Sequence, residues 1–211
     1  MRHWVAAILF GACAPVAWAG EVTLAVASNF VTTAEEIAAA FETETGHEIV
    51  LAHGSTGQIF SQVVSGAPFD VFLSADAERP AKLVETGRAK AARTYALGRL
   101  VLVSTVPVTR ESAVEAMTGK TVALADPTVA PYGKAAVSAM EGLKLDTATF
   151  RPVLVSNVGQ VASIFATGNA EFAFVSVCLL YTSPSPRDLI AHLVCRLLLE
   201  KWGGGGGGGG G

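Results

Sequence analysis

The sequence predicts an α/β fold, because short apolar segments of strand length alternate with helical segments throughout its middle. The strand-like segments are continuously apolar, which is typical of strands buried on both faces of a parallel sheet. The helical segments carry apolar residues three and four positions apart, and glycine or proline ends them. Together these observations favour parallel-rich sheets with helices packed on both faces.

The first half of this alternation runs from residue 22 to residue 86. Along its first expected helix, one face carries Ala34, Ile37, Ala38 and Phe41, and Gly46 ends the helix. We predict strands at 22–27, 48–52 and 71–74, and helices at 30–45, 58–65 and 80–86.

The second half begins with an apolar strand after a longer connection. The same reasoning predicts strands at 100–104, 121–125, 152–156 and 172–176, and helices at 111–118, 133–142 and 160–167. In such sheets a ligand binds beyond the carboxyl ends of the strands, where the strand-to-helix turns gather.

Composition excludes two classes of protein. The chain has 211 residues, of which 51% are hydrophobic and 16% are charged, and its formal net charge is −3. This charge excludes a basic nucleic-acid-binding protein, and the apolar content excludes a disordered acidic chain. Because Cys13, Cys178 and Cys195 all lie outside residues 20–177, we expect neither a disulfide framework nor a cysteine-based metal site in the middle of the chain.

Residues 1–19 are predicted to be a cleavable signal peptide. Arg2 supplies a positive start, an apolar segment follows, and Ala17 and Ala19 place small residues around a cleavage site after Ala19. The alternatives are a transmembrane anchor, for which the apolar segment is short, and lipid modification of Cys13. We expect the mature protein to work in the periplasm.

Residues 178–211 are predicted to be a non-native tail. The segments 178–188 and 193–201 back-translate in one reading frame to strings that resemble a sequencing adapter, and nine glycines follow at 203–211. The alternative is an apolar C-terminal helix at 189–202. We therefore leave this tail out of the functional reasoning.

Four strand-to-helix turns share small residues, several of which carry hydroxyl or amide groups. They lie at 27–29, 54–57, 131–133 and 156–159. The N-terminus of a helix has unpaired backbone N–H groups and a partial positive charge. Several such ends that converge would form an anion site without lysine or arginine. The alternative is ordinary helix capping, since serine, threonine and asparagine are the preferred N-cap residues.

Several segments carry a resemblance to a known family. They lie at 25–30, 53–57, 66–76, 94–102, 126–127 with 130–133, and 157–160. In this order they resemble the periplasmic molybdate-binding proteins, and the resemblance runs from about residue 21 to residue 176. It implies a two-lobed receptor of the type II periplasmic-binding-protein class, which delivers its ligand to an ABC importer.

The resemblance also implies the groups that would hold an oxyanion. They would be Ser28, Asn29, Ser55 or Thr56, the backbone of Tyr132 and the backbone of Val158. Part of the family has a tyrosine near the strand that ends here at Ser176, whereas this chain has Tyr132 instead. Molybdenum would enter as molybdate held by these same residues, and no separate cofactor is expected.

The same resemblance implies lobes at 20–98 and 99–177. In this class the chain crosses between the lobes twice, so its C-terminal part normally returns to the first lobe. Here the segment 178–211 stands in place of that return, and we expect an incomplete first lobe and a partial second lobe. Such a chain would expose apolar surface and be unstable or inactive.

A site made of neutral donors suits a permanently deprotonated dianion such as molybdate or tungstate, which exchanges its water shell for charge-assisted hydrogen bonds. Hydrogenphosphate would need an acceptor carboxylate, and Asp70, Asp76 and Asp126 are expected to be turn and cap residues. The alternatives are a receptor for sulfate, phosphate or an organic acid, and a non-functional truncated reading frame.

Enzymatic motifs fail on their spacing. The segments 117–121 and 133–134 lack the upstream glycine of a phosphate-binding loop. The turn 54–57 lacks the G-x-S-x-G motif of a hydrolase nucleophile, and Ser55 and His53 lie too close together on a strand end to form a nucleophile–base pair. We therefore expect a monomeric binding protein that is not an enzyme, whose partners are a small oxyanion and an ABC importer permease and do not include nucleic acid.

Overall fold

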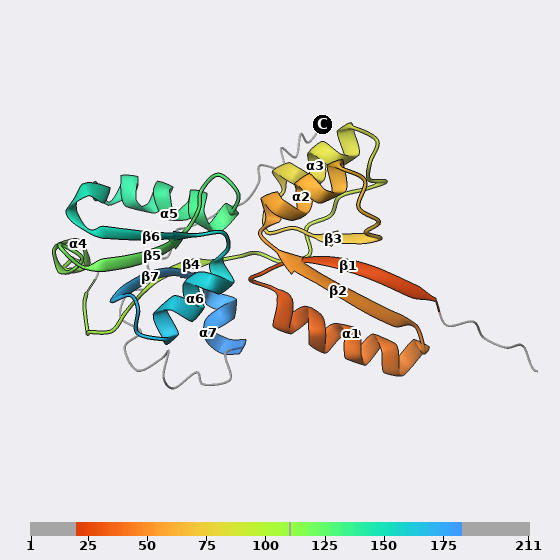
Figure 1. Ribbon diagram of the computed structural model, residues 1–211, viewed down its shortest axis with the longest axis horizontal. Helices are drawn as coiled ribbons and strands as arrows, with labels where there is room; N and C mark the ends of the chain where they lie inside the picture. The colour runs from red at the N-terminus through yellow and green to blue at the C-terminus, as the bar shows by residue number, and fades with distance from the viewer. Residues whose placement is uncertain (1–19, 110, 183–211) are drawn as a thin grey trace, which may run out of the picture.

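The computed structural model describes residues 20–109 and 111–182. The predicted signal peptide at 1–19, with Cys13, and the part of the predicted tail at 183–211 lie outside the described residues. Within the described ranges the chain forms two α/β lobes side by side, each with its own sheet (Figure 1). The predicted α/β class with parallel-rich sheets in two lobes is confirmed.

The first lobe comprises the elements from β1 to α3. They are β1 (Glu21–Ala27), α1 (Val31–Thr45), β2 (Glu48–Gly54), α2 (Thr56–Val64), β3 (Val71–Leu73) and α3 (Glu78–Glu85). The strands are parallel in the order β2-β1-β3, with Glu21 beside Glu48 and Leu24 beside Val71. Helix α1 covers one face of this sheet, and α2 and α3 lie on the other (Figure 1).

The second lobe comprises the elements from β4 to α7. They are β4 (Leu100–Ser104), α4 (Ala113–Ala116), β5 (Thr121–Ala125), α5 (Pro131–Gly142), the 3₁₀ helix η1 (Thr147–Thr149), β6 (Arg151–Val155), α6 (Val158–Ala166), β7 (Phe172–Ser176) and α7 (Val177–Thr182). The strand order is β4-β7-β5-β6, and β5 is parallel to both of its neighbours. Helices α5 and α6 lie on opposite faces of the sheet (Figure 1).

Strand β4 departs from the expected parallel arrangement. It pairs antiparallel with β7, so that Leu100 lies beside Ser176. Parallel neighbours are joined by a crossover, usually a helix, that returns the chain to the same end of the sheet. Residues 86–99 instead bring the chain from the first lobe without a helix or strand, so β4 enters the second sheet free of that constraint.

Three helices begin two residues earlier than predicted, directly after the strand-to-helix turns. Helix α2 follows a capping box, in which the Ser55 side chain accepts from the backbone N–H of Gln58 and the Gln58 side chain accepts from that of Ser55. Helix α5 starts at Pro131, whose fixed φ suits the first helical position. The Asn157 side chain caps α6. The predicted helix at 111–118 is shorter, since α4 spans four residues.

The main core lies in the second lobe, where all residues of β4 and β7 are buried. Leu180 of α7 is 2% exposed and belongs to this core, so the first residues of the predicted tail lie in a packed helix. Their expected origin as adapter sequence stays a prediction. No helix in the part of the chain that the structure describes is long and apolar enough to cross a membrane.

Candidate functional site

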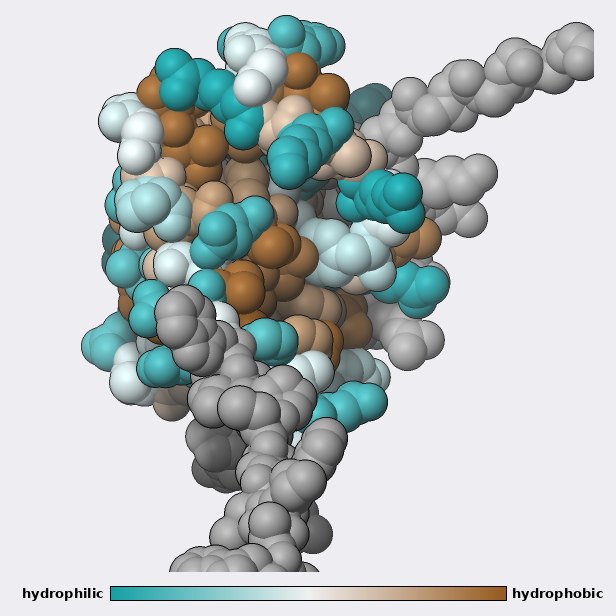
Figure 2. Space-filling model, turned by 90° about the vertical axis from the view of Figure 1, so that its right-hand side faces the viewer, coloured by the Kyte–Doolittle hydropathy of each residue, from teal (hydrophilic) through white to brown (hydrophobic). Residues whose placement is uncertain are grey.

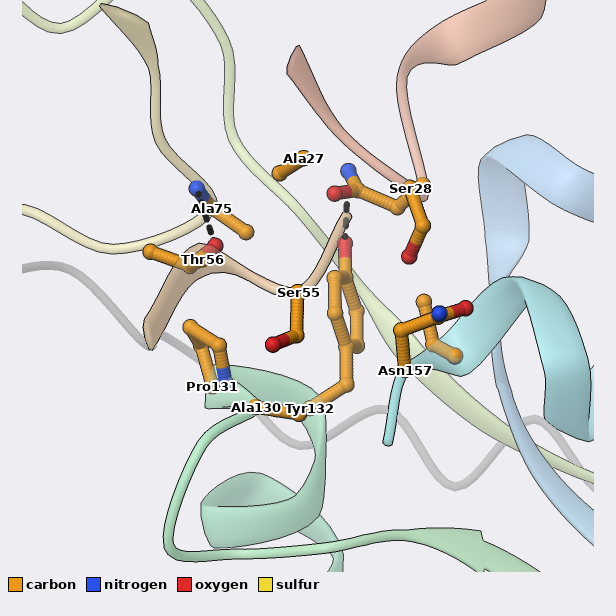
Figure 3. Close-up of a pocket in the computed structure, with 11 residues that line it drawn as sticks. Ala27, Ser28, Ser55, Thr56, Ala75, Ala130, Pro131, Tyr132 and Asn157 are labelled. Atoms are coloured by element: carbon orange, nitrogen blue, oxygen red, sulfur yellow. Dashed lines mark hydrogen bonds between the residues drawn. The ribbon is translucent and has the colours of Figure 1, made fainter. Parts of the chain in front are cut away.

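The strand-to-helix turns singled out in the sequence meet in one pocket between the lobes (Figure 3). The pocket holds about 190 Å³ of empty space, part of it open to solvent. Its lining residues are Ala27, Ser28, Asn29, Ser55, Thr56, Ala75, Ala130, Pro131, Tyr132, Asn157 and Val158. All six predicted site residues are thus brought together. Sequence reasoning did not assign Ala75, although it lies in one of the segments that carry the resemblance.

Three helix N-termini face this pocket. Ser55 precedes α2, Tyr132 is the second residue of α5, and Val158 is the first residue of α6. The first N–H groups of a helix have no partner within the helix and carry the positive end of its dipole. Because one of these ends comes from the first lobe and two from the second, a ligand between them would contact both lobes.

Ser28 and Asn29 do not act as helix caps. The N-cap of α1 is Phe30, which makes no side-chain capping bond. The backbone N–H of Ser28 donates to the carbonyl of Gly54 at 3.0 Å, which ties the first turn to the second. The capping alternative is therefore wrong for this turn, and both side chains line the pocket without capping a helix.

Ser55 and Thr56 differ in what their hydroxyl groups contact. The Thr56 Oγ1 accepts from the backbone N–H of Ala75 at 3.2 Å. The Ser55 Oγ accepts from Gln58 at 3.3 Å, and Figure 3 shows its hydroxyl directed toward the start of α5. A hydroxyl that accepts one hydrogen bond can still donate its own proton, so Ser55 has a donor facing the pocket.

The side chain of Tyr132 is a feature that sequence reasoning missed. The Ser176 Oγ donates to its hydroxyl at 2.9 Å, and the Asn29 Nδ2 donates to it at 3.4 Å. Burial raises the pKa of Tyr132 to about 12, although the bond from Ser176 acts to lower it. Tyr132 thus brings a neutral hydroxyl to the end of β7, where the resemblance had placed a tyrosine in part of the family.

The eleven residues drawn around the pocket are uncharged at neutral pH. The aspartates near the strand ends are engaged elsewhere. Asp76 and Asp126 make the local bonds predicted for turn and cap residues, whereas Asp70 bonds to strand β1. Asp76 accepts from the backbone of Arg79 and pairs with its guanidinium, and Asp126 accepts twice from Thr128. These bonds from Thr128 hold the pKa of Asp126 below its usual value. Asp70 accepts from the backbone of Thr23.

The lobes contact each other directly beside the pocket. The backbone N–H of Gly57 donates to the carbonyl of Val129 at 2.9 Å. A Cβ on Gly57 would lie 2.7 Å from that carbonyl oxygen, so the approach requires glycine. Farther out, Lys134 and Glu78 form an exposed ion pair at 3.5 Å. These contacts join the two lobes directly, and we term this arrangement closed.

The described residues contain no cluster of three or more histidine, cysteine, aspartate or glutamate side chains suited to a metal ion. The exposed His53 does not line the pocket. The pocket has an uncharged lining and faces three helix N-termini, so it offers hydrogen-bond donors to an anion.

Known proteins with this arrangement match the chain over most of its length. The profile of the bacterial extracellular solute-binding protein family matches residues 22–194. The molybdate-binding protein ModA of Rhodobacter capsulatus is 46% identical over 176 residues, which are 81% of this chain and 69% of that protein. ModA of Azotobacter vinelandii is 41% identical over 187 residues, 86% of this chain and 74% of that protein.

A solved structure agrees with these matches. The periplasmic molybdate-binding protein of Azotobacter vinelandii superposes with a TM-score of 0.69 at 36% identity, covering 74% of this chain and 71% of that one. The sequence matches and the fold thus agree, and the chain belongs to the bacterial extracellular solute-binding protein family.

Proposed function

We propose that this chain is a periplasmic receptor that captures molybdate or tungstate in the pocket between its lobes and delivers it to an ABC importer. The observation that carries the proposal is the convergence of neutral donors from both lobes on a pocket with an uncharged lining. The names of the matched relatives, which bind molybdate, support the choice of ligand.

The proposed donors divide between the lobes. The first lobe supplies the side chains of Ser28, Asn29 and Ser55, and the second supplies the backbone N–H groups of Tyr132 and Val158. Thr56 remains an alternative to Ser55, because its hydroxyl accepts from Ala75 as that of Ser55 accepts from Gln58, and each keeps its own proton to donate. Since neither lobe carries the whole set, ligand binding favours the closed arrangement.

The chemistry of these donors favours a fully deprotonated dianion. Each charge-assisted hydrogen bond contributes roughly 1.5–3 kcal/mol net, so several of them can replace the water shell of the ion. Hydrogenphosphate would place its own proton against a donor, and no carboxylate is among the residues that line the pocket. Sulfate is excluded by size rather than charge, because a smaller ion leaves donors without a partner.

We infer that the lobes extend over residues 20–98 and 99–177 and that the first lobe lacks elements that would complete it. The half-exposed strands β2 and β3 support this inference. The proposed receptor is a monomer that performs no catalysis, and its protein partner is the membrane permease of the importer.

Isothermal titration calorimetry of the full chain with molybdate, tungstate, sulfate and phosphate tests the ligand, and tight binding of molybdate would overturn the expectation that the incomplete chain is unstable or inactive. We expect molybdate and tungstate to bind at least about tenfold more tightly than sulfate and phosphate. Ser55→Ala should weaken molybdate binding about tenfold or more. The matched control is Ser61→Ala, a serine on the same helix whose hydroxyl donates to the Gly57 carbonyl. Equal affinity for all four anions would contradict the proposal.

A further inference from the structure

A buried hydrogen-bonded triad joins the two lobes at the back of the pocket. It consists of Asn29 from the first lobe and of Tyr132 and Ser176 from the second. Asn29 is 9% exposed, Tyr132 8% and Ser176 0%. The bond at 3.4 Å from Asn29 to Tyr132 is therefore a contact that exists in the closed arrangement of the lobes.

The hydrogen bonds of this triad are incomplete. The Tyr132 oxygen accepts from both Ser176 and Asn29, so its own proton still needs an acceptor. Beside it, the buried Asn29 Oδ1 finds no hydrogen-bond partner within residues 20–109 and 111–182. A buried polar atom without a partner destabilises the structure. The Tyr132 hydroxyl proton and the Asn29 Oδ1 are one donor and one acceptor that could satisfy each other.

A half-turn of the Asn29 amide resolves both deficits. It exchanges the positions of Oδ1 and Nδ2, so that the Tyr132 hydroxyl donates to Oδ1. The Nδ2 group then occupies the place of the orphaned oxygen, and Asn29 is one of the residues that line the pocket. A carbonyl oxygen would repel an oxyanion, whereas an N–H group donates to it.

We propose that the Tyr132 hydroxyl is a positioning group that, on lobe closure, orients the Asn29 amide with its N–H toward the bound oxyanion. This inference rests on the proposed function and adds a side-chain role to a residue assigned there for its backbone. Ser176 completes the triad. Because its hydroxyl donates to the Tyr132 oxygen, the phenolic proton of Tyr132 is left to donate to Asn29. Closure and donor orientation are thereby coupled through one hydroxyl.

The surroundings of the Tyr132 hydroxyl fit this role. A Cβ on Gly98 would collide with it, so the hydroxyl lies against the connection between the lobes at a point where glycine leaves room. With its pKa near 12, the phenol stays protonated and remains a donor at neutral pH. The triad therefore acts through geometry and not through titration.

The test compares two tyrosine variants in the full chain. Tyr132→Phe keeps the ring and the backbone N–H but removes the positioning hydroxyl. Tyr95→Phe is the matched control, because the Tyr95 hydroxyl donates to the Ser74 carbonyl at 2.9 Å outside the triad. In calorimetry with molybdate we expect Tyr132→Phe to bind about tenfold more weakly and Tyr95→Phe to stay within about twofold of the parent.

A second readout separates positioning from general damage. In ¹⁵N-edited NMR spectra, the Asn29 side-chain amide signals should shift when molybdate is added to the parent and shift less in Tyr132→Phe. Ser176→Ala leaves the tyrosine intact, carries the test if Tyr132→Phe fails to fold, and should weaken binding about threefold.

One outcome would contradict the positioning role alone, and another would contradict the proposed function. If the parent binds molybdate and the Tyr132 and Ser176 variants match it in affinity and amide shift, the positioning role is wrong while the proposed function stands. If the parent binds none of the four anions, the proposed function is wrong, and the positioning role falls with it.

Discussion

The two lobes contribute similar turns to the pocket but are packed very differently. In the second lobe every residue of β4 and β7 is buried, including Phe172 and Phe174. In the first lobe the buried apolar residues are few and mostly small, and Ile37 on α1 is 56% exposed. Figure 2 shows apolar surface between hydrophilic side chains on the end of the molecule formed by this lobe.

This difference shows that the residues of strand-to-helix turns can form a binding site on a lobe with few buried apolar residues. Capping and backbone hydrogen bonds place Ser28 and Ser55, and they depend on neighbouring residues more than on a large core. We expect the first lobe to be the less stable half and the second lobe to support the closed site.

Removing one phenylalanine from each lobe is expected to give the largest difference in the free energy of unfolding. Phe174 is 1% exposed and Phe41 is 41% exposed. We expect Phe174→Ala to lower the free energy of unfolding by about 3–5 kcal/mol and Phe41→Ala to lower it by less than about 1 kcal/mol. Urea unfolding followed by circular dichroism measures both, and similar losses for the two variants would show that the lobes are packed alike.

Alkaline titration tests the burial of Tyr132 at the junction of the lobes. Since the pKa of Tyr132 is about 12 in the folded chain and about 10 in an unfolded one, the unfolded state loses its proton first as pH rises. The buried phenol contributes its full stabilisation below pH 10. As the pH rises from about 10 to 12, this contribution to the free energy of unfolding, about 2–3 kcal/mol, is lost. Unfolding measured across this window should depend less on pH in Tyr132→Phe, and an unchanged dependence would contradict the burial of this phenol.

Gly57→Ala should separate closure from folding. The new methyl group would lie 2.7 Å from the Val129 carbonyl oxygen and push the lobes apart. We expect about tenfold weaker molybdate binding, with a loss of unfolding free energy below about 1 kcal/mol. Gly142→Ala is the control, since a Cβ there meets open space. A Gly57→Ala chain that binds as the parent does would show that this contact is not needed for closure.

The smallest effect is expected at the outer contact between the lobes. The Lys134–Glu78 pair is 3.5 Å apart, and its side chains are 43% and 73% exposed. Glu78→Gln should change molybdate affinity by less than about twofold, because solvent and salt screen exposed ion pairs. A larger change would mean that charge, and not the backbone contact at Gly57, holds the lobes together.

The sequence predicted the alternation of elements and the turns that form the pocket, because both depend on local patterns. Ser55 is an example, since its capping box is readable from Gln58 three residues later. The early start of α5 was also readable from Pro131, which favours the first helical position.

Other features depend on contacts between distant segments and carry no local signal. The antiparallel pairing of β4 follows from the path of the chain between the lobes. The Tyr132 hydroxyl meets Ser176 and Asn29, which lie 44 and 103 residues away. Such contacts require the fold, and the resemblance to the molybdate-binding proteins assigned Tyr132 no more than its backbone.

A crystal structure of the full chain with molybdate, phased on the anomalous signal of molybdenum, would locate the ligand. We expect one molybdenum peak in the pocket, with its oxygens held by Ser55 and by the backbone N–H groups of Tyr132 and Val158. A peak outside the pocket, or oxygens held by lysine and arginine side chains, would contradict this expectation.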